Sequence, residues 1–514
     1  MSEESDKKKR AAAGLVMAAA TFSMAAASGV QAALYLHSFG IDGRTDGFFV
    51  AFALYTVFGV FSQSIRVTSA PLLVDEKRSL PLREFAATLV LIAIPVALLT
   101  IPLASPLSFI LAPGLSEADR AVTQEALPIL GGAMILQLWA AGGATVLAVR
   151  DRFNTIAGAY IAGAGAGLVV YLAVSASAGE LSLGYSMLAM AVVTCSLMLL
   201  GLRRSPAATT SPAPAGPLRL RRLLADAGLI LGRTSIYLAF NALYLITLSL
   251  TTSFSPGDAT VLSYAYLFAS YLVAGTAFAL GMSRIADMSR EARSDPRRAF
   301  GDTVPQGFRY SMLICAPALA GFVAAGAPIV GVLFSASLEP DDVRILQEFG
   351  ALLSIWTVAA LLVNLMLPAM FALGRARLTN LLAPALLAVH FAVSLAGGEL
   401  FGSLGVVGAA FVAPSLFAAV MLRTGAPEIA GHLGREVSRD ALRFVVAAAA
   451  CYGLGATLGA AVGSTLGAAL IAGLVGTVLY LVLLPFVAPT QVELFRRLLR
   501  PLLKARRTGP QAAT

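Results

Sequence analysis

Three ionisable residues lie within or at the start of otherwise apolar segments, and two of them could bind an anion. Asp46 begins one segment (FGIDGRTDGFFVAF), and Arg66 lies about two turns from the far end of the same segment. Arg233 lies about three turns into a later apolar segment (GLILGRTSIYLAF). Charged groups at membrane depth are costly, so each is a candidate functional residue. A guanidinium that faced a central cavity could hold phosphate or carboxylate oxygens bidentately.

Each of these residues also has a purely structural explanation. Asp46 could cap the amino end of its own helix, a role compatible with a place in a functional site. Arg66 and Arg233 could extend their long side chains to the membrane interface. Both explanations stay open at this point.

Uncharged polar residues also interrupt the apolar segments, and they could line a hydrated path for a substrate. Hydrogen bonding between helices is the simpler explanation for them. Gln137 and His390 belong to this group but not to the predicted site. The predicted substrate-binding set consists of Asp46, Arg66, Arg233, Gln31, Gln63, Asn241 and Asn364.

Motifs of enzymes and of metal sites are absent from the sequence. It contains no Walker motif, no GxSxG and no HExxH. The three cysteines show no CxxC spacing, and the three histidines are scattered. We therefore expect no catalytic residues, no metal and no cofactor.

The composition indicates that these residues are positioned by transmembrane helices. Hydrophobic residues make up 58% of the 514 residues and charged residues only 13%, whereas soluble domains are roughly a quarter charged. A hydrocarbon core requires about twenty apolar residues per helix. The sequence predicts an all-α polytopic membrane protein with about fourteen spans. Their approximate limits are 11–36, 47–72, 84–112, 124–149, 154–177, 180–202, 223–253, 257–283, 307–336, 345–373, 377–397, 400–423, 440–463 and 466–488.

Lysine and arginine concentrate in alternate gaps between these segments. The gap from Asp75 to Arg83 carries three cations, and the next, from Ser116 to Arg120, carries one. The positive-inside rule then places both ends of the chain in the cytoplasm. The net charge of +9 is explained by cytoplasmic loops that face anionic lipid, without nucleic acid. The first apolar run of about 25 residues is too long for a signal peptide, so we expect an uncleaved transmembrane helix.

An internal repeat divides the predicted helices into two lobes. The loop Leu115–Glu125 (LSEADRAVTQE) recurs 223 residues later as Leu338–Glu348 (LEPDDVRILQE), and Asp46 and Asp258 head corresponding segments. We predict pseudo-symmetric six-helix lobes, joined by a linker and followed by two additional helices and a basic amphipathic tail. The predicted limits are 1–202, 203–222, 223–423, 424–488 and 489–514.

Prolines recur inside the predicted spans, where they break helical hydrogen bonds around a cavity or a hinge. With two lobes and a linker, they favour alternating access by rocking. These prolines include Pro95, Pro102, Pro317, Pro328, Pro368 and Pro384.

Several segments resemble the MurJ/MviN lipid II flippases of the MOP (multidrug/oligosaccharidyl-lipid/polysaccharide) exporter superfamily. FGIDGRTDGFFVAFALY (39–55) is similar to the FG…TDAFFVAF pattern of that family. Residues 261–290, 316–334 and 402–422 resemble its eighth, ninth and twelfth helices. The resemblance implies a flippase in the bacterial inner membrane, driven by membrane potential or an ion gradient. Its substrate would be a polyprenyl-pyrophosphate-linked glycan such as a lipid II-like peptidoglycan precursor.

The resemblance is weakest at the residues expected to bind pyrophosphate. The family's first-helix arginines correspond here to Ala25 and Gln31, and the arginine of its eighth-helix pattern to Leu267. Asp46 matches the family's acidic residue. Two alternatives therefore remain: a small-molecule or multidrug exporter on the same scaffold, and a transport-inactive scaffold for cell-wall synthesis.

Overall fold

The computed structural model describes most of the chain, and the described part is helical. The described residues are 27, 29–74, 81–204, 218–278, 301–326, 329–330, 340–462, 464–489 and 493. No strand occurs among them. The all-α prediction is confirmed. Most of the first predicted span, most of the linker and nearly all of the tail lie outside the described residues.

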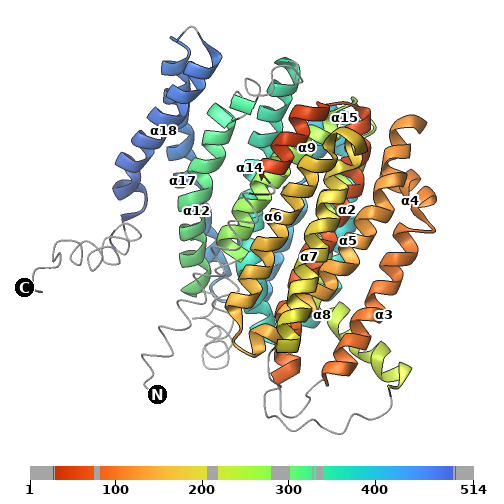
Figure 1. Cartoon of the computed structure of the whole chain (residues 1–514). Coiled ribbons are helices and arrows are strands. Elements are labelled where there is room, and N and C mark those ends of the chain that lie inside the picture. Colours follow the sequence, from red (N-terminus) through yellow and green to blue (C-terminus); the bar gives the residue numbers. More distant parts are fainter. Residues whose placement is uncertain are drawn as a thin grey trace, which may run out of the picture. The chain divides into compact units, whose positions relative to one another are not determined.

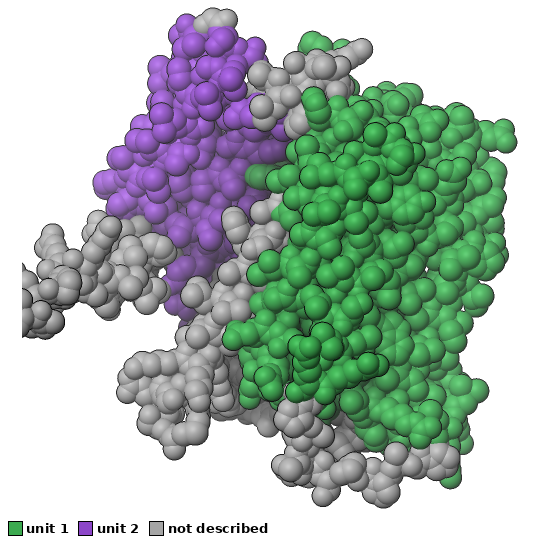
Figure 2. Space-filling model, in the orientation of Figure 1, with its two compact units in different colours: residues 1–271, 334–353, 374–417 green, residues 272–333, 354–373, 418–514 purple. Residues whose placement is uncertain are grey.

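The helices form two compact units, which Figure 2 distinguishes by colour. Unit 1 comprises residues 1–271, 334–353 and 374–417, and unit 2 comprises 272–333, 354–373 and 418–514. Unit 1 contains a helix over residues 29–39, α2 (Gly43–Val74), α3 (Leu82–Thr100), α4 (Ala104–Leu111), α5 (Glu117–Val149), α6 (Phe153–Ala178), the 3-10 turn η1 (Gly179–Leu181), α7 (Ser182–Arg204), α8 (Leu220–Thr251), most of α9 (Asp258–Val273), and α15 (Ala376–Ala409) (Figure 1).

Unit 2 contains two π-helical segments among its helices. Its elements are η2 (Ala274–Phe278), α12 (Thr303–Gly321), η3 (Phe322–Gly326), α17 (Ala430–Gly459) and α18 (Thr465–Val487). The helices α14 (Pro340–Ala372) and α16 (Val412–Gly425) each run from unit 1 into unit 2. The boundary between the two compact units therefore does not fall at the predicted linker. α8, which follows that linker, belongs to the same unit as α2 to α7. The lobes defined by pseudo-symmetry stay a prediction.

Eleven helices among the described residues are long and apolar enough to cross a membrane. One of them, Phe153–Arg204, extends over 52 residues and contains two of the predicted spans. Gly179 has φ +54° and separates α6 from α7 there, so the chain can reverse at a residue without a Cβ. The count of fourteen spans stays a prediction.

Two predicted helix limits need correction. The third span, expected to be continuous over 84–112, breaks at residues 101–103 between α3 and α4. Pro102 lies in that break and not inside a helix, because proline cannot donate to the preceding turn. The boundary predicted between residues 397 and 400 falls at Gly402, where φ is +61° and ψ is −145° within α15.

The repeat inferred from two short loops extends to whole helices. α5 and α14 are both 33 residues long, and α14 begins and ends 223 residues after α5. The next helix in each copy follows the same shift, since α6 begins at Phe153 and α15 at Ala376. The equal length of α5 and α14 and the equal connections that follow them show that the chain repeats the same helix plan over this stretch.

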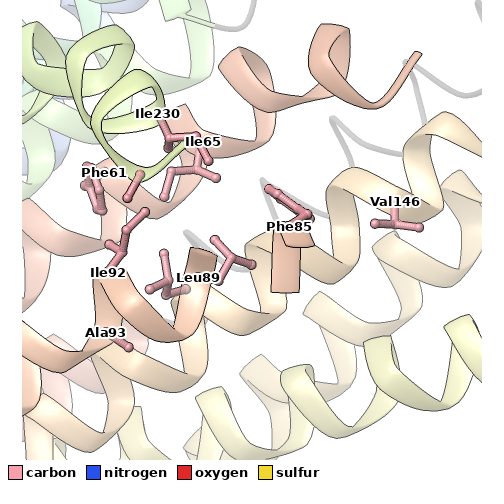
Figure 3. Close-up of a cluster of buried hydrophobic side chains, with 10 residues drawn as sticks. Phe61, Ile65, Phe85, Leu89, Ile92, Ala93, Val146 and Ile230 are labelled. Atoms are coloured by element: carbon pink, nitrogen blue, oxygen red, sulfur yellow. The ribbon is translucent and has the colours of Figure 1, made fainter. Parts of the chain in front are cut away.

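An apolar cluster joins α2, α3, α5 and α8 within unit 1. Figure 3 shows Ile230 of α8 beside Ile65 of α2, with Phe61 in the same cluster. Phe85 and Leu89 of α3 are 1% and 2% exposed, so they pack as a core does. In a membrane such contacts are stabilised by close packing more than by the hydrophobic effect, because lipid tails are equally apolar. An ion pair between Arg222 of α8 and Glu84 of α3 (3.0 Å) adds a further contact between these helices.

Candidate functional site

Asp46 joins the amino ends of two helices that are far apart in sequence. Its side chain is fully buried, and its carboxylate accepts hydrogen bonds from the Gly257 N–H (2.6 Å) and the Thr260 N–H (2.7 Å). The Thr260 hydroxyl donates a third hydrogen bond (2.7 Å). Asp46 therefore caps α9, where the unpaired N–H groups of a helix start favour an anion.

The amino end of α2 itself is capped by Asp42 and not by Asp46. The Asp42 carboxylate accepts from the Thr45 N–H (2.8 Å), and the Thr45 hydroxyl accepts from the Asp42 N–H (2.9 Å). This reciprocal pair resembles a capping box. The expectation that Asp46 caps its own helix is thus corrected, because the nearer aspartate already has that position.

Gly257 makes the cap on α9 possible. Its φ is +95°, and a Cβ built there would lie 2.4 Å from Cγ2 of Ile41. Any other residue would be strained in that conformation and would collide with the segment that leads into α2. The backbone N–H of residue 257 can therefore approach the Asp46 carboxylate only when the residue is glycine.

Gln31 lies at the centre of a group of buried polar side chains in unit 1. It is 1% exposed, and neither amide atom has a hydrogen-bond partner among the described residues. A Cβ built on Gly167 of α6 would lie 3.2 Å from Gln31 Nε2 and 3.2 Å from the Ser186 hydroxyl of α7. The helix of residues 29–39, α6 and α7 therefore bring their polar groups together here.

A further buried hydroxyl near Gln31 also lacks a hydrogen-bond partner among the described residues. It belongs to Tyr35, which follows Gln31 by one helical turn and is 0% exposed. Tyr171 of α6 and Ser182 of α7 are also buried, and their hydroxyls lie beside each other. Buried polar groups are normally paired, and leaving them unpaired costs free energy unless a ligand or water completes them. The predicted set omitted Tyr35, although its spacing of one helical turn from Gln31 was a usable signal.

The other predicted site residues are not shown to join the buried polar group around Gln31. Asn241 of α8 and Asn364 of α14 each donate their amide to the carbonyl one turn back, Tyr237 O (2.8 Å) and Ala360 O (2.9 Å). Arg233 is partly buried on α8. The side chains of Gln63 and Arg66, on α2, lie outside the described residues.

These helices can be compared with those of known proteins. The sequence model of the lipid II flippase MurJ matches residues 37–471, which is most of the chain. The chain belongs to the MurJ lipid II flippase family. Together with the eleven apolar helices, this makes it a multi-pass membrane protein of a transporter family. No curated protein matches the chain in a direct sequence search.

Solved structures support the same fold. A structure of the lipid II flippase MurJ in an inward closed conformation has a TM-score of 0.71 at 13% identity and covers 93% of this chain and 100% of its own. A multidrug resistance MATE family transporter of the MOP superfamily, in an inward-facing conformation, has a TM-score of 0.60 at 14% identity and covers 81% of this chain and 99% of its own. A eukaryotic MATE transporter has a TM-score of 0.58 at 16% identity and covers 84% of this chain and 98% of its own. The MurJ fold is thus shared despite low identity.

Proposed function

We propose that this protein is a lipid II-type flippase of the bacterial inner membrane. It moves a polyprenyl-pyrophosphate-linked glycan precursor from the inner to the outer leaflet, and it is not an enzyme. The observation that carries this proposal is the match of the MurJ family over residues 37–471. The MATE-like fold supports a small-molecule exporter less well, because that likeness is weaker in TM-score and in coverage.

Alternating access requires contacts that can separate as one group of helices tilts against another. The apolar cluster of α2, α3, α5 and α8 and the Arg222–Glu84 ion pair join helices from the two sides of the predicted linker. On the predicted topology the cluster and the ion pair lie at the cytoplasmic ends of these helices, and they would hold the transporter closed on that side. Prolines inside helices, such as Pro95 in α3 and Pro384 in α15, supply positions where such tilting can bend a helix.

Binding of pyrophosphate requires donors or cations, and the family's arginine positions hold Ala25, Gln31 and Leu267. Gln31 is buried among hydroxyls, and its amide can donate to a phosphate oxygen. We propose that Arg66 and Arg233 supply the positive charge that binds the pyrophosphate. The basic cytoplasmic loops would attract anionic lipid of the inner leaflet. The full proposed site remains Asp46, Arg66, Arg233, Gln31, Gln63, Asn241 and Asn364.

The double variant Arg66→Gln/Arg233→Gln is expected to lower the rate of flipping at least about tenfold, equivalent to ~1.4 kcal/mol of lost binding or transition-state stabilisation. The measurement is the movement of a lipid-linked pyrophosphate substrate across proteoliposomes by the purified protein. The matched control is Arg150→Gln/Arg152→Gln, in the turn between α5 and α6. A normal rate in the first variant would show that these arginines do not bind the substrate.

Depletion of the protein in its native host tests the function itself. A flippase predicts that lipid-linked precursor accumulates in the inner leaflet and that re-expression of the full chain reverses this. Unchanged precursor pools with loss of drug efflux would support the exporter. Unchanged pools and efflux, with mislocalised cell-wall enzymes, would support the transport-inactive scaffold.

A further inference from the structure

His390 is a buried histidine between two helices of unit 1. It lies on α15 with 0% of its surface exposed. Its Nε2 is 2.9 Å from the Leu243 carbonyl oxygen and 2.9 Å from the Thr247 hydroxyl, both on α8. Ionisable residues at membrane depth are uncommon and usually have a function.

The neighbours of Nε2 determine which ring nitrogen carries the proton. A carbonyl oxygen can only accept, and the Thr247 hydroxyl already donates to the Leu243 carbonyl (2.9 Å). Both neighbours therefore present acceptors to the ring, so Nε2 carries the hydrogen. Nδ1 then holds a lone pair, and it is buried with no hydrogen-bond partner among the described residues.

A second unpaired group lies one turn further along α15. Ser394 is also 0% exposed, and its hydroxyl has no partner in the described part of the chain. Spacing of four residues places it on the same helix face as His390. Ser394 lines a pocket of about 340 Å³, together with Ser253 beyond the end of α8 and Gly398 and Glu399 of α15. This volume holds several water molecules at roughly 30 Å³ each.

Among the described residues, two acidic groups lie near this path. Glu399 is exposed and lines the pocket, and Asp258 at the start of α9 lies beside Ser403 of α15. On α8, Tyr244 turns to α9, where its hydroxyl donates to Ser263 (2.9 Å). Of the described residues, those that hydrogen-bond the His390 ring are Leu243 and Thr247, and neither is charged.

We infer that Nδ1 of His390 is a proton-binding site that is filled from the pocket through the Ser394 hydroxyl. A hydrated proton in the pocket is passed to the Nδ1 lone pair, which leaves water behind and produces an imidazolium. His390 Nδ1 and the Ser394 hydroxyl are not hydrogen-bonded to each other in this structure, so the hydroxyl has to turn toward the ring to accept from Nδ1–H, while Nε2–H keeps its two acceptors. The inference rests on the transport function proposed above and specifies the coupling ion as H⁺.

Protonation would alter the contact between α8 and α15. The neutral ring fits among apolar side chains, whereas a positive charge there is costly unless water or a carboxylate approaches it. Hydration from the pocket that Glu399 lines would therefore accompany protonation and loosen the α8–α15 contact. On the predicted topology the pocket lies at the outer end of α8, so the proton would enter from outside the cell.

The first test measures flipping of a lipid-linked pyrophosphate in proteoliposomes at a series of imposed pH gradients. We expect the wild-type rate to change at least about tenfold across the series, and His390→Gln to abolish this dependence. Glutamine keeps an N–H donor for Leu243 and Thr247 but is not a base. His432→Gln, on α17 with a side chain 80% exposed, is the control and is expected to keep the dependence. An unaltered pH dependence in His390→Gln would overturn the inference.

The second test does not require cargo, so it separates failure of this inference from failure of the proposed function. Full-length protein with ¹⁵N-labelled histidine is examined in liposomes by solid-state NMR, and the His390 signals are assigned by their loss in His390→Gln. We expect the neutral Nε2–H form at pH 8 and a growing share of imidazolium as the pH is lowered toward 4, with Ser394→Leu preventing the change. A ring that stays neutral throughout, or that titrates equally in Ser394→Leu, would overturn the site or its route, whether or not lipid is flipped.

Discussion

The Asp46→Ala variant is expected to unfold at a much lower temperature than the wild-type protein and to lose transport. The buried carboxylate accepts three hydrogen bonds, from the N–H groups of Gly257 and Thr260 and from the Thr260 hydroxyl. Alanine removes these bonds and leaves two buried N–H donors unpaired at the start of α9. The cost is about 3 kcal/mol or more, because each buried donor left unpaired costs about 1–3 kcal/mol and three donors lose their acceptor.

Two related variants make this expectation specific. Asp46→Asn keeps one carbonyl oxygen but places an NH₂ group toward a backbone N–H, so we expect an intermediate loss. Asp42→Asn is the matched control, since asparagine caps a helix about as well as aspartate. Thermal unfolding of the purified proteins in detergent measures all three. Equal unfolding temperatures for Asp46→Ala and Asp42→Asn would show that the α9 cap contributes nothing.

The Gln31→Leu variant is expected to keep or raise the unfolding temperature while the rate of flipping falls at least about tenfold, or ~1.4 kcal/mol. Gln31 is buried with both amide atoms unpaired among the described residues, which costs about 1–3 kcal/mol in the folded state. Leucine has a similar volume and removes that cost. It also removes the amide that would meet a phosphate oxygen, so stability and activity change in opposite directions.

Gln137→Leu is the contrasting variant. The Gln137 amide donates to the Tyr55 hydroxyl, so leucine leaves a buried hydroxyl without its partner. We expect Gln137→Leu to lower the unfolding temperature and to change flipping only as far as stability does. A fall in unfolding temperature for Gln31→Leu, or an unchanged rate of flipping, would show that the Gln31 amide is structural.

Much of the architecture could be predicted, because the bilayer restricts the chain to a few solutions. A backbone in hydrocarbon must satisfy its own hydrogen bonds, so long apolar segments have to be helices. The loop repeat at a shift of 223 residues predicted a correspondence that α5 and α14 then showed at both ends. The break at Pro102 was missed, because the apolar run continues through it without a change in composition.

The site could be predicted only in part. Asp46 and Gln31 were selected because a polar residue in an apolar segment is costly, and both are buried. The Asp46 carboxylate is hydrogen-bonded, whereas the Gln31 amide has no partner among the described residues. Sequence patterns did not reveal that Asp46 caps α9, because the donors lie more than 200 residues away. Nor did they distinguish Asn241, which is satisfied by its own helix, from Gln31, which is not.

The sequence alone determined that the chain is a helical membrane protein with a repeated plan and a MurJ-like amino-terminal motif. These properties depend on composition and on spacing along the chain, because a long apolar segment in a bilayer has to form a helix whatever its neighbours are. Only the tertiary structure decided which polar groups are paired. A polar side chain can hydrogen-bond within its own helix as Asn241 does, can cap a distant helix as Asp46 does, or can have no partner among the described residues, as His390 Nδ1 does. Which of these outcomes occurs depends on which neighbouring group comes within hydrogen-bonding distance, and the packing of the helices determines that distance.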